Sequence, residues 1–130
     1  ARFAEIGINL NVLPPGKPMA MYHEEDAEEA FLVVRGECLL IVEGEERPLR
    51  HWDFVFCPPW TKHVIVGAGS SPALVLAVGG RGKSGLNYPV DEAAVRHGAG
   101  VTEETPDGRR AYAAFSRPEA GAAPDLETMG

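Results

Sequence analysis

Short apolar segments recur about every ten residues through most of the chain, and this pattern limits the fold more than any other feature. Each segment is rich in Val, Leu, Ile or Phe, and glycine, proline or acidic residues separate it from the next. Such spacing is typical of an all-β sandwich or barrel. The expected strands are residues 6–13, 19–25, 31–34, 38–42, 52–57, 64–66 and 74–78.

The character of the chain changes after the last expected strand. We assign the β-barrel to residues 1–86 and a C-terminal extension to residues 87–115, which packs on the barrel or on a partner subunit. Within the extension, residues 91–97 predict a short helix. Residues 116–130 are rich in Ala, Pro, Gly and Glu. Since they have too few apolar side chains to offset the entropy of ordering, we expect a mobile tail.

Composition and charge exclude several classes of partner. The chain has 130 residues, which suits one domain with its own core. Its net charge of −7 argues against nucleic acid or an anionic membrane as a partner, because both reward basic patches. No apolar run approaches the ~18 residues of a membrane span, and no signal peptide is visible. We therefore expect a cytoplasmic protein whose Cys38 and Cys57 are reduced core thiols rather than a disulfide.

Two clusters of polar side chains stand beside the apolar segments. His23 and Glu25 share one face of their expected strand, because side chains alternate along a strand. Glu29 precedes the apolar Phe31 by two residues, so its burial would be costly unless a cation meets it. His63 follows a Pro-Pro turn and leads into an apolar strand. Two imidazoles and two carboxylates can together hold a divalent transition metal.

The alternative is that the acidic run is a solvated turn and that the histidines are hydrogen-bonded core residues. We favour a metal because four ligand groups recur at fixed spacing on neighbouring strands.

These residues resemble the two motifs of the cupin superfamily, whose members are small jelly-roll β-barrels. The first family motif has glycine, His-x-His, Glu and glycine, and here the corresponding residues are Gly16, His23, Glu25, Glu29 and Gly36. The second has glycine, Pro-x-Gly-x-x-His and Asn, and here the residues are Trp52, Pro58, Trp60, His63 and Gly67. The resemblance covers about residues 10–79. It implies a cupin-type jelly-roll (double-stranded β-helix) barrel with His23, Glu25, Glu29 and His63 as metal ligands.

The chain departs from the family pattern at four positions. Glu25 replaces the second motif histidine, Trp52 and Trp60 replace glycines, and Gly67 replaces the closing Asn. With two carboxylates instead of one, a divalent site changes from a net charge of about +1 to about zero, so it is a weaker Lewis acid. Its harder oxygen ligands favour Mn, Fe or Zn over Cu(I), with Ni as a further candidate.

Apolar side chains around these ligands indicate a cavity for a small molecule. We assign Met21, Phe31, Trp52 and Trp60 to it as substrate-binding residues. For Trp60 two alternatives stay open, since its ring could stack on a substrate at the cavity mouth or pack on a neighbouring loop.

Three hypotheses about function follow. The first is a metal-dependent enzyme with dioxygenase or isomerase chemistry on a small organic molecule, in which Glu25 or Glu29 leaves the metal to act as a base. The second is a non-catalytic module that binds or senses a small ligand in the same cavity. The third is a metal-free structural domain, which the cost of gathering unpaired carboxylates disfavours. We favour the first.

The sequence also indicates a homodimer. Residues 31–34 and 39–42 are apolar on both faces of their expected strands, so their outer faces must be covered. Either the segment at residues 88–115 or a second copy of the barrel could provide that cover.

Overall fold

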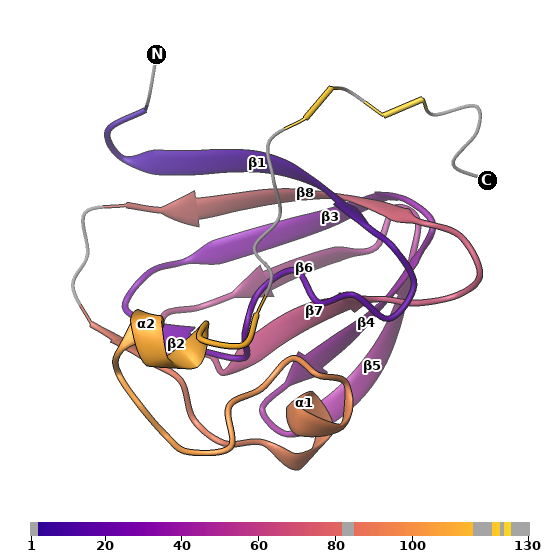
Figure 1. The fold of residues 1–130 in the computed structure, drawn as a ribbon. Coiled ribbons are helices and arrows are strands. Elements are labelled where there is room, and N and C mark those ends of the chain that lie inside the picture. Colours follow the sequence, from indigo (N-terminus) through magenta and orange to yellow (C-terminus); the bar gives the residue numbers. More distant parts are fainter. Residues whose placement is uncertain (1–2, 82–84, 116–120, 123, 126–130) are drawn as a thin grey trace.

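The computed structural model describes residues 3–81, 85–115, 121–122 and 124–125, and two antiparallel sheets form its body (Figure 1). The larger sheet has four strands, in the order β1 (Ile6–Leu13), β8 (Ala73–Gly80), β3 (Glu29–Arg35) and β6 (Phe54–Cys57). The smaller sheet has three, in the order β5 (Glu45–Arg50), β4 (Glu37–Val42) and β7 (His63–Gly67). A separate pair joins β2 (Glu24–Glu25) to β9 (Leu86–Asn87).

The main core lies between the inner faces of the two sheets. Strand alternation puts Phe31 and Val33 of β3 on the inside, where they meet Leu40 of β4 and Ile65 of β7. The remaining buried members of this cluster are Leu13, Cys38, Cys57, Ala73 and Val75. Both cysteines are free and buried, as the sequence predicts.

The C-terminal extension covers the outer face of the three-stranded sheet. Its helix α1 (Glu92–Arg96) buries Ala93 and Ala94 against Ile41, Val64 and Val66, which point away from the barrel interior. Figure 1 shows α1 in front of β4 and β5. Of the two covers that the sequence left open for this face, the chain itself provides the first.

A third apolar cluster lies beside the barrel, under the helix α2 (Gly108–Ala111). Met21 packs there against Tyr88, Val101 and Ala111, so the extension is tied to the barrel at a second place.

Two of the unusual motif positions keep the backbone conformation that glycine normally provides. Trp52 has φ +70° and Trp60 has φ +64°, so both adopt the left-handed conformation that side chains disfavour. Gly67 stands where a Cβ atom would collide with the backbone carbonyl oxygen of Pro14. The tryptophans at these two motif positions therefore adopt a backbone conformation that glycine reaches without strain.

The all-β fold is confirmed, and α1 lies where the sequence predicts a helix. The strand β5 and the helix α2 were not predicted, and the strand expected at residues 19–25 is reduced to β2 and isolated bridges. The tail expected at residues 116–130 lies almost wholly outside the described residues. Neither described helix has the length or apolarity to cross a membrane.

Candidate metal centre

The two histidines are brought together by the backbone. His23 and His63 form an isolated antiparallel bridge, in which the amide of His63 donates to the carbonyl of His23 at 3.0 Å and the reverse bond measures 3.2 Å. Directly paired residues project their side chains to the same side of a sheet. The two rings consequently lie with their centroids 4.8 Å apart.

Each ring is held in one orientation by a backbone carbonyl. Nδ1 of His23 lies 2.7 Å from the carbonyl oxygen of Met21, and Nδ1 of His63 lies 2.8 Å from that of Thr61. A carbonyl oxygen only accepts, so both Nδ1 atoms carry the proton. In the neutral rings both Nε2 atoms then have a free lone pair, which is the form in which histidine binds a metal.

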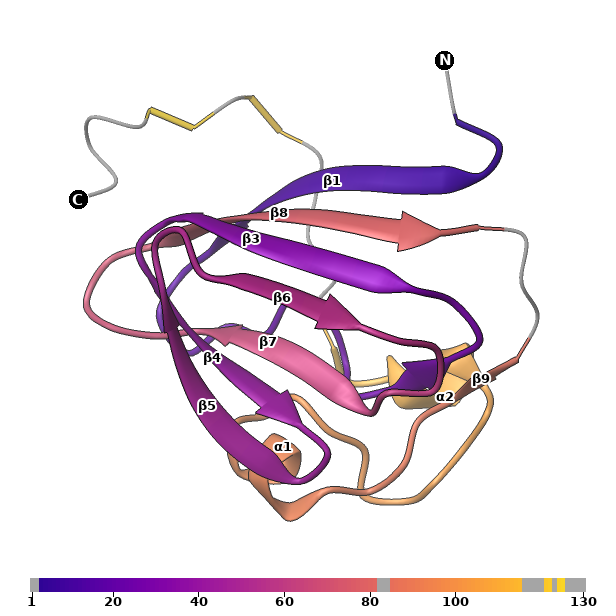
Figure 2. The ribbon, with the colours of Figure 1, turned by 180° about the vertical axis from the view of Figure 1, so that it is seen from behind.

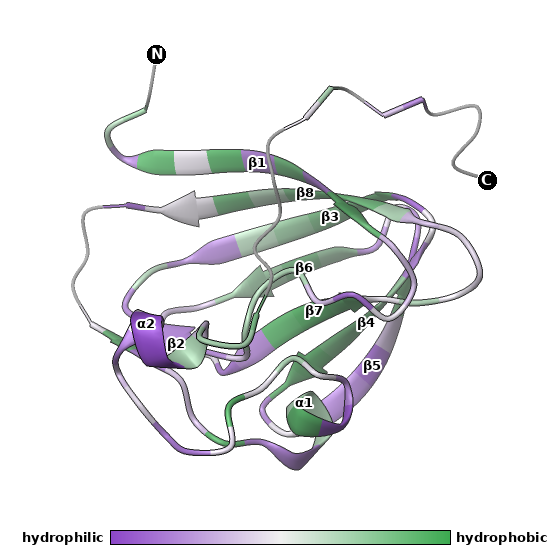
Figure 3. Cartoon of the chain, viewed as in Figure 1, coloured by the Kyte–Doolittle hydropathy of each residue, from purple (hydrophilic) through white to green (hydrophobic). Residues whose placement is uncertain are grey.

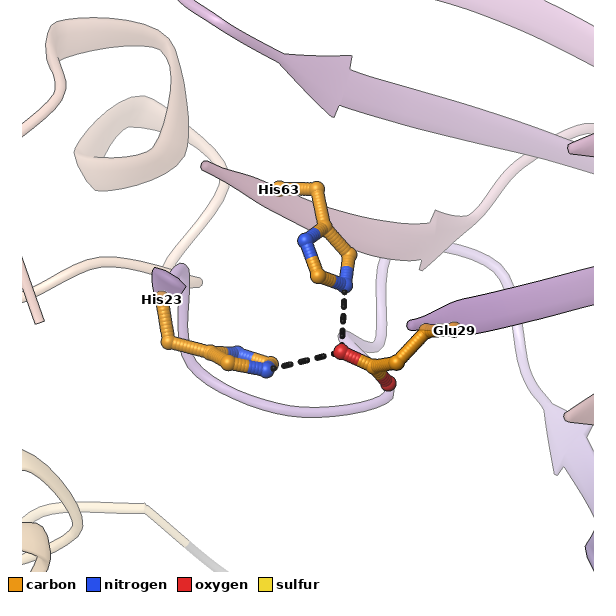
Figure 4. A group of neighbouring side chains, drawn as sticks. All are labelled: His23, Glu29 and His63. Atoms are coloured by element: carbon orange, nitrogen blue, oxygen red, sulfur yellow. Dashed lines mark ion pairs between the residues drawn. The ribbon is translucent and has the colours of Figure 1, made fainter. Parts of the chain in front are cut away.

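Glu29 supplies the third group from the neighbouring sheet (Figure 4). It is the first residue of β3, between Cys57 of β6 and Gly79 of β8. Its Oε1 lies 3.0 Å from Nε2 of His63 and 3.4 Å from Nε2 of His23. Two ligands of one metal ion, each about 2.1 Å from it, lie about 3.0 to 3.4 Å apart in octahedral or tetrahedral geometry. These distances fit a shared cation.

The two closest of these atoms, Nε2 of His63 and Oε1 of Glu29, have no hydrogen-bond partner in the part of the chain that the structure describes. Nε2 of His63 and Oε1 of Glu29 are both buried, and among the described residues neither has a hydrogen bond of acceptable geometry. Buried polar groups are nearly always paired, so such a pair needs an explanation. A lone pair on nitrogen and a carboxylate oxygen repel each other unless a positive charge stands between them. The donor set therefore fits a divalent metal ion.

The pKa values of His23 and Glu29 in the metal-free cluster also indicate a site for positive charge. Burial by itself disfavours the imidazolium of His23, but the carboxylates of Glu25 and Glu29 outweigh it and raise the pKa of His23 to about 10. Burial likewise favours neutral Glu29, but His23 and His63 outweigh it and hold the pKa of that carboxyl well below its usual range. The cluster binds positive charge strongly, as a proton when no metal is present.

Glu25 stands apart from the other three predicted ligands. Its Oε1 lies 3.5 Å from Nε2 of His23, and its side chain is 31% exposed against 18% for Glu29. The ligand atoms of His23, Glu29 and His63 all lie within 4.8 Å of one another, and Glu25 is not part of that group. The structure thus joins three of the four residues and leaves Glu25 at the rim.

Aromatic rings surround the histidines. The ring of Phe31, a predicted substrate-binding residue, is buried with its centroid 5.7 Å from that of His63. Tyr88 comes from the C-terminal extension, and its ring centroid lies 6.0 Å from that of His23. Tyr88 was not predicted as a site residue, because it lies outside both motifs and its position depends on how the extension folds back.

The other predicted substrate-binding residues lie elsewhere. Trp52 is 70% exposed and lines a cavity of about 660 Å³ at the far end of β3, together with Arg35, Arg50 and Ser71, so its assignment to the site is not supported. Met21 contributes its carbonyl to His23, but its side chain packs under α2.

Trp60 follows the second of its two alternatives. Its indole lies against Gly85, so closely that a Cβ atom on that glycine would come within 2.9 Å of the ring. The amide of Trp60 also donates to the carbonyl of Glu25 at 2.7 Å. This tryptophan packs on a neighbouring loop and joins the second motif to the segment that carries Glu25.

A cavity of about 530 Å³ lies beside Glu29, and neither His23 nor His63 is part of its lining. Its lining includes Glu29, Phe56, Pro59, Val78 and Arg81, and none of the four predicted substrate-binding residues. Ala30, Phe56 and Val78 form one row on the outer side of the four-stranded sheet, so this cavity lies on the side opposite the core.

The sequence also matches the profile of a known protein family. The sequence profile of the cupin domain matches residues 9–79, more than half of the chain and all four predicted ligands. The chain belongs to the cupin family. No curated protein matches this cupin in sequence.

Solved structures agree. This cupin is similar to a candidate sugar phosphate isomerase from Acidithiobacillus ferrooxidans, with 33% identity and a TM-score of 0.57 over 59% of this chain and 51% of that one. It spans about half the length of that protein. It is also similar to a cupin protein from Bacteroides fragilis, with 25% identity and a TM-score of 0.56 over 64% of this chain and 70% of that one.

An RmlC-like cupin from Methanocaldococcus jannaschii, described as a double-stranded β-helix, shares 23% identity, with a TM-score of 0.55 over 60% of this chain and 72% of that one. At that identity the similarity supports the fold alone. The jelly-roll, double-stranded β-helix architecture expected from the sequence is confirmed.

Proposed function

We propose that this cupin is a metal-dependent enzyme that acts on a small organic molecule. The observation that carries the proposal is the convergence of Nε2 of His23, Nε2 of His63 and Oε1 of Glu29, with both Nδ1 atoms committed to backbone carbonyls. These three residues would hold a divalent ion of the Mn, Fe or Zn type. When bound, such an ion supplies a Lewis acid and exchangeable positions for small ligands.

The two carboxylates have different roles in this proposal. Glu29 is the more buried and lies against both imidazoles, which suits a permanent ligand. Glu25 is more exposed and lies against His23 and Glu29 rather than against both imidazoles, so it can change position at lower cost. We assign the proton-transferring role to Glu25, either as a fourth ligand that leaves or as a free base beside the ion.

The donor set favours oxygenase chemistry over isomerase chemistry. Two histidines and one carboxylate, with further positions open, are the ligand set of non-haem Fe(II) oxygenases. The similarity to a candidate sugar phosphate isomerase supports the second reaction class. Oxygen uptake by the Fe(II)-loaded protein with candidate substrates separates the two reaction classes, because an oxygenase consumes dioxygen and an isomerase does not.

One observation favours the alternative of a non-catalytic binding or sensing module. Nε2 of His63 and Oε1 of Glu29 are shielded from solvent, and a catalytic ion must exchange water. Water proton relaxation of the Mn²⁺-loaded protein measures that exchange. Fast exchange supports an enzyme, and a relaxation rate no higher than that of a closed site supports the binding module.

Metal content tests the proposal most simply. Protein purified without added metal should carry close to one transition metal ion per chain, and His63→Ala should carry almost none. His51→Ala is the matched control, because His51 is an exposed histidine that lines the distant cavity. Equal metal content in the wild-type and His63→Ala proteins would remove His63 from the ligands.

We further propose that the protein is a cytoplasmic homodimer. The free, buried thiols of Cys38 and Cys57 support a reducing compartment. Exposed apolar side chains on the outer face of the four-stranded sheet, such as Leu10 and Phe54, support self-association.

A further inference from the structure

A second cavity, of about 660 Å³, opens at the end of β3 that lies away from the metal centre. Glu29 begins β3 and Arg35 ends it, so at about 3.3 Å per residue the two lie about 20 Å apart. Figure 2 shows β2 beside one end of β3 and the start of β4 beside the other. None of the three residues of the metal centre lines this cavity. It is therefore a separate site, which the proposed function does not use.

Basic side chains line this cavity in an otherwise acidic chain. Arg35 comes from the end of β3 and Arg50 from the end of β5, the hydrophilic strand beside the apolar β4 in Figure 3. Within the described lining Glu37 is the only acidic residue, although the chain has 19 Asp and Glu against 12 Lys and Arg. A guanidinium stays charged and offers a planar fork of donors that fits phosphate and carboxylate oxygens. The lining therefore suits an anionic group.

The loop between β7 and β8 forms another wall of the cavity. The carboxylate of Glu37 lies against this loop, since a Cβ atom on Gly69 would collide with its Oε2. The amide of Ala68 donates to the carbonyl of Glu37 at 3.0 Å, which fixes the loop to the start of β4. Ser70 and Ser71 of the same loop add hydroxyl groups to the lining, and these can donate to an anion.

Trp52 adds a flat apolar surface to the same lining. It is 70% exposed and has φ +70°. Its amide donates to the carbonyl of Val33 at 2.6 Å, and the carboxylate of Asp53 accepts from the amide of Arg50 at 2.9 Å, so the turn is fixed. Backbone strain of this kind clusters at ligand-binding sites. An exposed indole on a fixed turn is a surface on which a planar ring can stack.

The walls of the cavity are preformed. Gly36, in the turn between β3 and β4, has φ +85°, and a Cβ atom there would come within 2.8 Å of the backbone of Ala73. The turn therefore packs directly on the start of β8. The volume of about 660 Å³ also falls within the range of about 300 to 1,000 Å³ of small-molecule sites.

We propose that this cavity binds a small organic anion that carries a phosphate or carboxylate group on a flat ring. Arg35 and Arg50 hold the anionic group, together with the hydroxyls of Ser70 and Ser71. The indole of Trp52 stacks on the ring, and this contact offsets the exposure of the side chain. The proposal does not depend on the metal centre.

Four probes test the proposal. Adenosine monophosphate and benzoate carry the two kinds of anionic group on a flat ring, and adenosine and benzamide are their uncharged counterparts. The chain has two tryptophans, so Trp60→Phe leaves Trp52 as the only reporter. We expect at least one charged probe to quench its fluorescence, and to bind at least ~10-fold more tightly than its uncharged counterpart. Binding of one charged probe alone identifies the preferred anionic group.

Variants locate the bound probe, with affinity measured by calorimetry and folding by circular dichroism. Arg50→Ala and Trp52→Ala should each weaken binding at least ~10-fold. Arg47→Ala is the matched control, because Arg47 lies on the same strand but outside the lining, where it pairs with Glu45. His63→Ala should bind as tightly as the wild type, since the metal centre lies at the other end of β3.

Failure of both charged probes to bind at millimolar concentration would overturn the proposal. So would affinities that stay unchanged in Arg50→Ala and Trp52→Ala, or equal affinity for the charged and uncharged probes. Loss of binding in His63→Ala would place the anion at the metal centre and also overturn it. Metal content in the same samples separates the two proposals: wild-type protein that binds the probe but holds no metal contradicts only the metal centre.

Discussion

Oε1 of Glu29 lies 3.0 Å from Nε2 of His63, and both atoms are buried without a hydrogen bond between them. Nδ1 of His63 donates a hydrogen bond to the carbonyl oxygen of Thr61, so the lone pair of the neutral ring lies on Nε2, which faces the carboxylate. Two acceptors held this close are unfavourable unless a cation joins them. The barrel thus provides a preformed place for positive charge, and His23 completes it from the other side.

The first prediction concerns the pH dependence of stability without metal. In the folded chain the pKa of His23 is raised from 6.5 to about 10, so its protonated form stabilises the fold. That contribution is complete below pH 6.5 and is lost as pH rises through about 10. Urea unfolding of the chelator-treated protein should therefore show a free energy of unfolding that falls as the pH rises from 6.5 to 9.

The upper pH limit of 9 keeps the measurement below the range in which the two cysteine thiols affect stability. Burial raises the pKa of Cys38 and of Cys57 from 9.0 to about 11, so they reduce stability only above pH 9. In His23→Gln the slope between pH 6.5 and 9 should disappear. A slope that persists in that variant would show that His23 does not carry the effect.

The second prediction concerns Glu29→Gln, which keeps the shape of the side chain and removes its charge. We expect metal affinity to fall at least ~100-fold. Loss of a group that only hydrogen-bonds to a metal ligand lowers affinity about 10 to 100-fold, and loss of a direct ligand should lower it further. In the metal-free variant the pKa of His23 should also fall, because a carboxylate that raises it has gone. Calorimetry and the NMR titration of the imidazole measure the two effects; an unchanged pKa of His23 would contradict the described contact.

The third prediction concerns the strained turn at Trp52. The residue has φ +70° and is 70% exposed, so its indole adds little packing to offset the left-handed backbone. Trp52→Gly and Trp52→Ala both remove the ring, and they differ in backbone strain. Thermal unfolding should show Trp52→Gly more stable than Trp52→Ala by about 1 kcal/mol, which is what the left-handed conformation costs a side chain. Equal stability would mean that the turn relaxes around alanine.

The fold and three of the site residues, His23, Glu29 and His63, could be predicted from the sequence for the same reason. Inward-facing apolar residues alternate along β3 and β4, and two histidines and a glutamate stand at strand ends beside them. Alternation is a local property of the backbone, so it can be read without knowledge of the fold.

What the sequence did not indicate depends on long-range contacts. Strand β5 reads as a polar turn because Glu45, Arg47 and Pro48 give it no apolar face; it forms as an edge strand on β4. Trp52 was assigned to the site as an apolar side chain close to the ligands in sequence, but its backbone forms a turn and its side chain lines another cavity. Tyr88 reaches His23 only because the extension folds back beside the barrel.

The location of a bound ion in a crystal tests the central claim most directly. Anomalous scattering at the absorption edge of the metal, from protein purified without added metal, should show one peak per chain, about 2.0 to 2.3 Å from Nε2 of His23, Nε2 of His63 and Oε1 of Glu29. A peak elsewhere, such as between His97 and Glu46, where Nε2 and Oε1 lie 2.6 Å apart, would contradict the assigned centre. So would a map in which the three atoms stay together with only a hydrogen-bonded water between them.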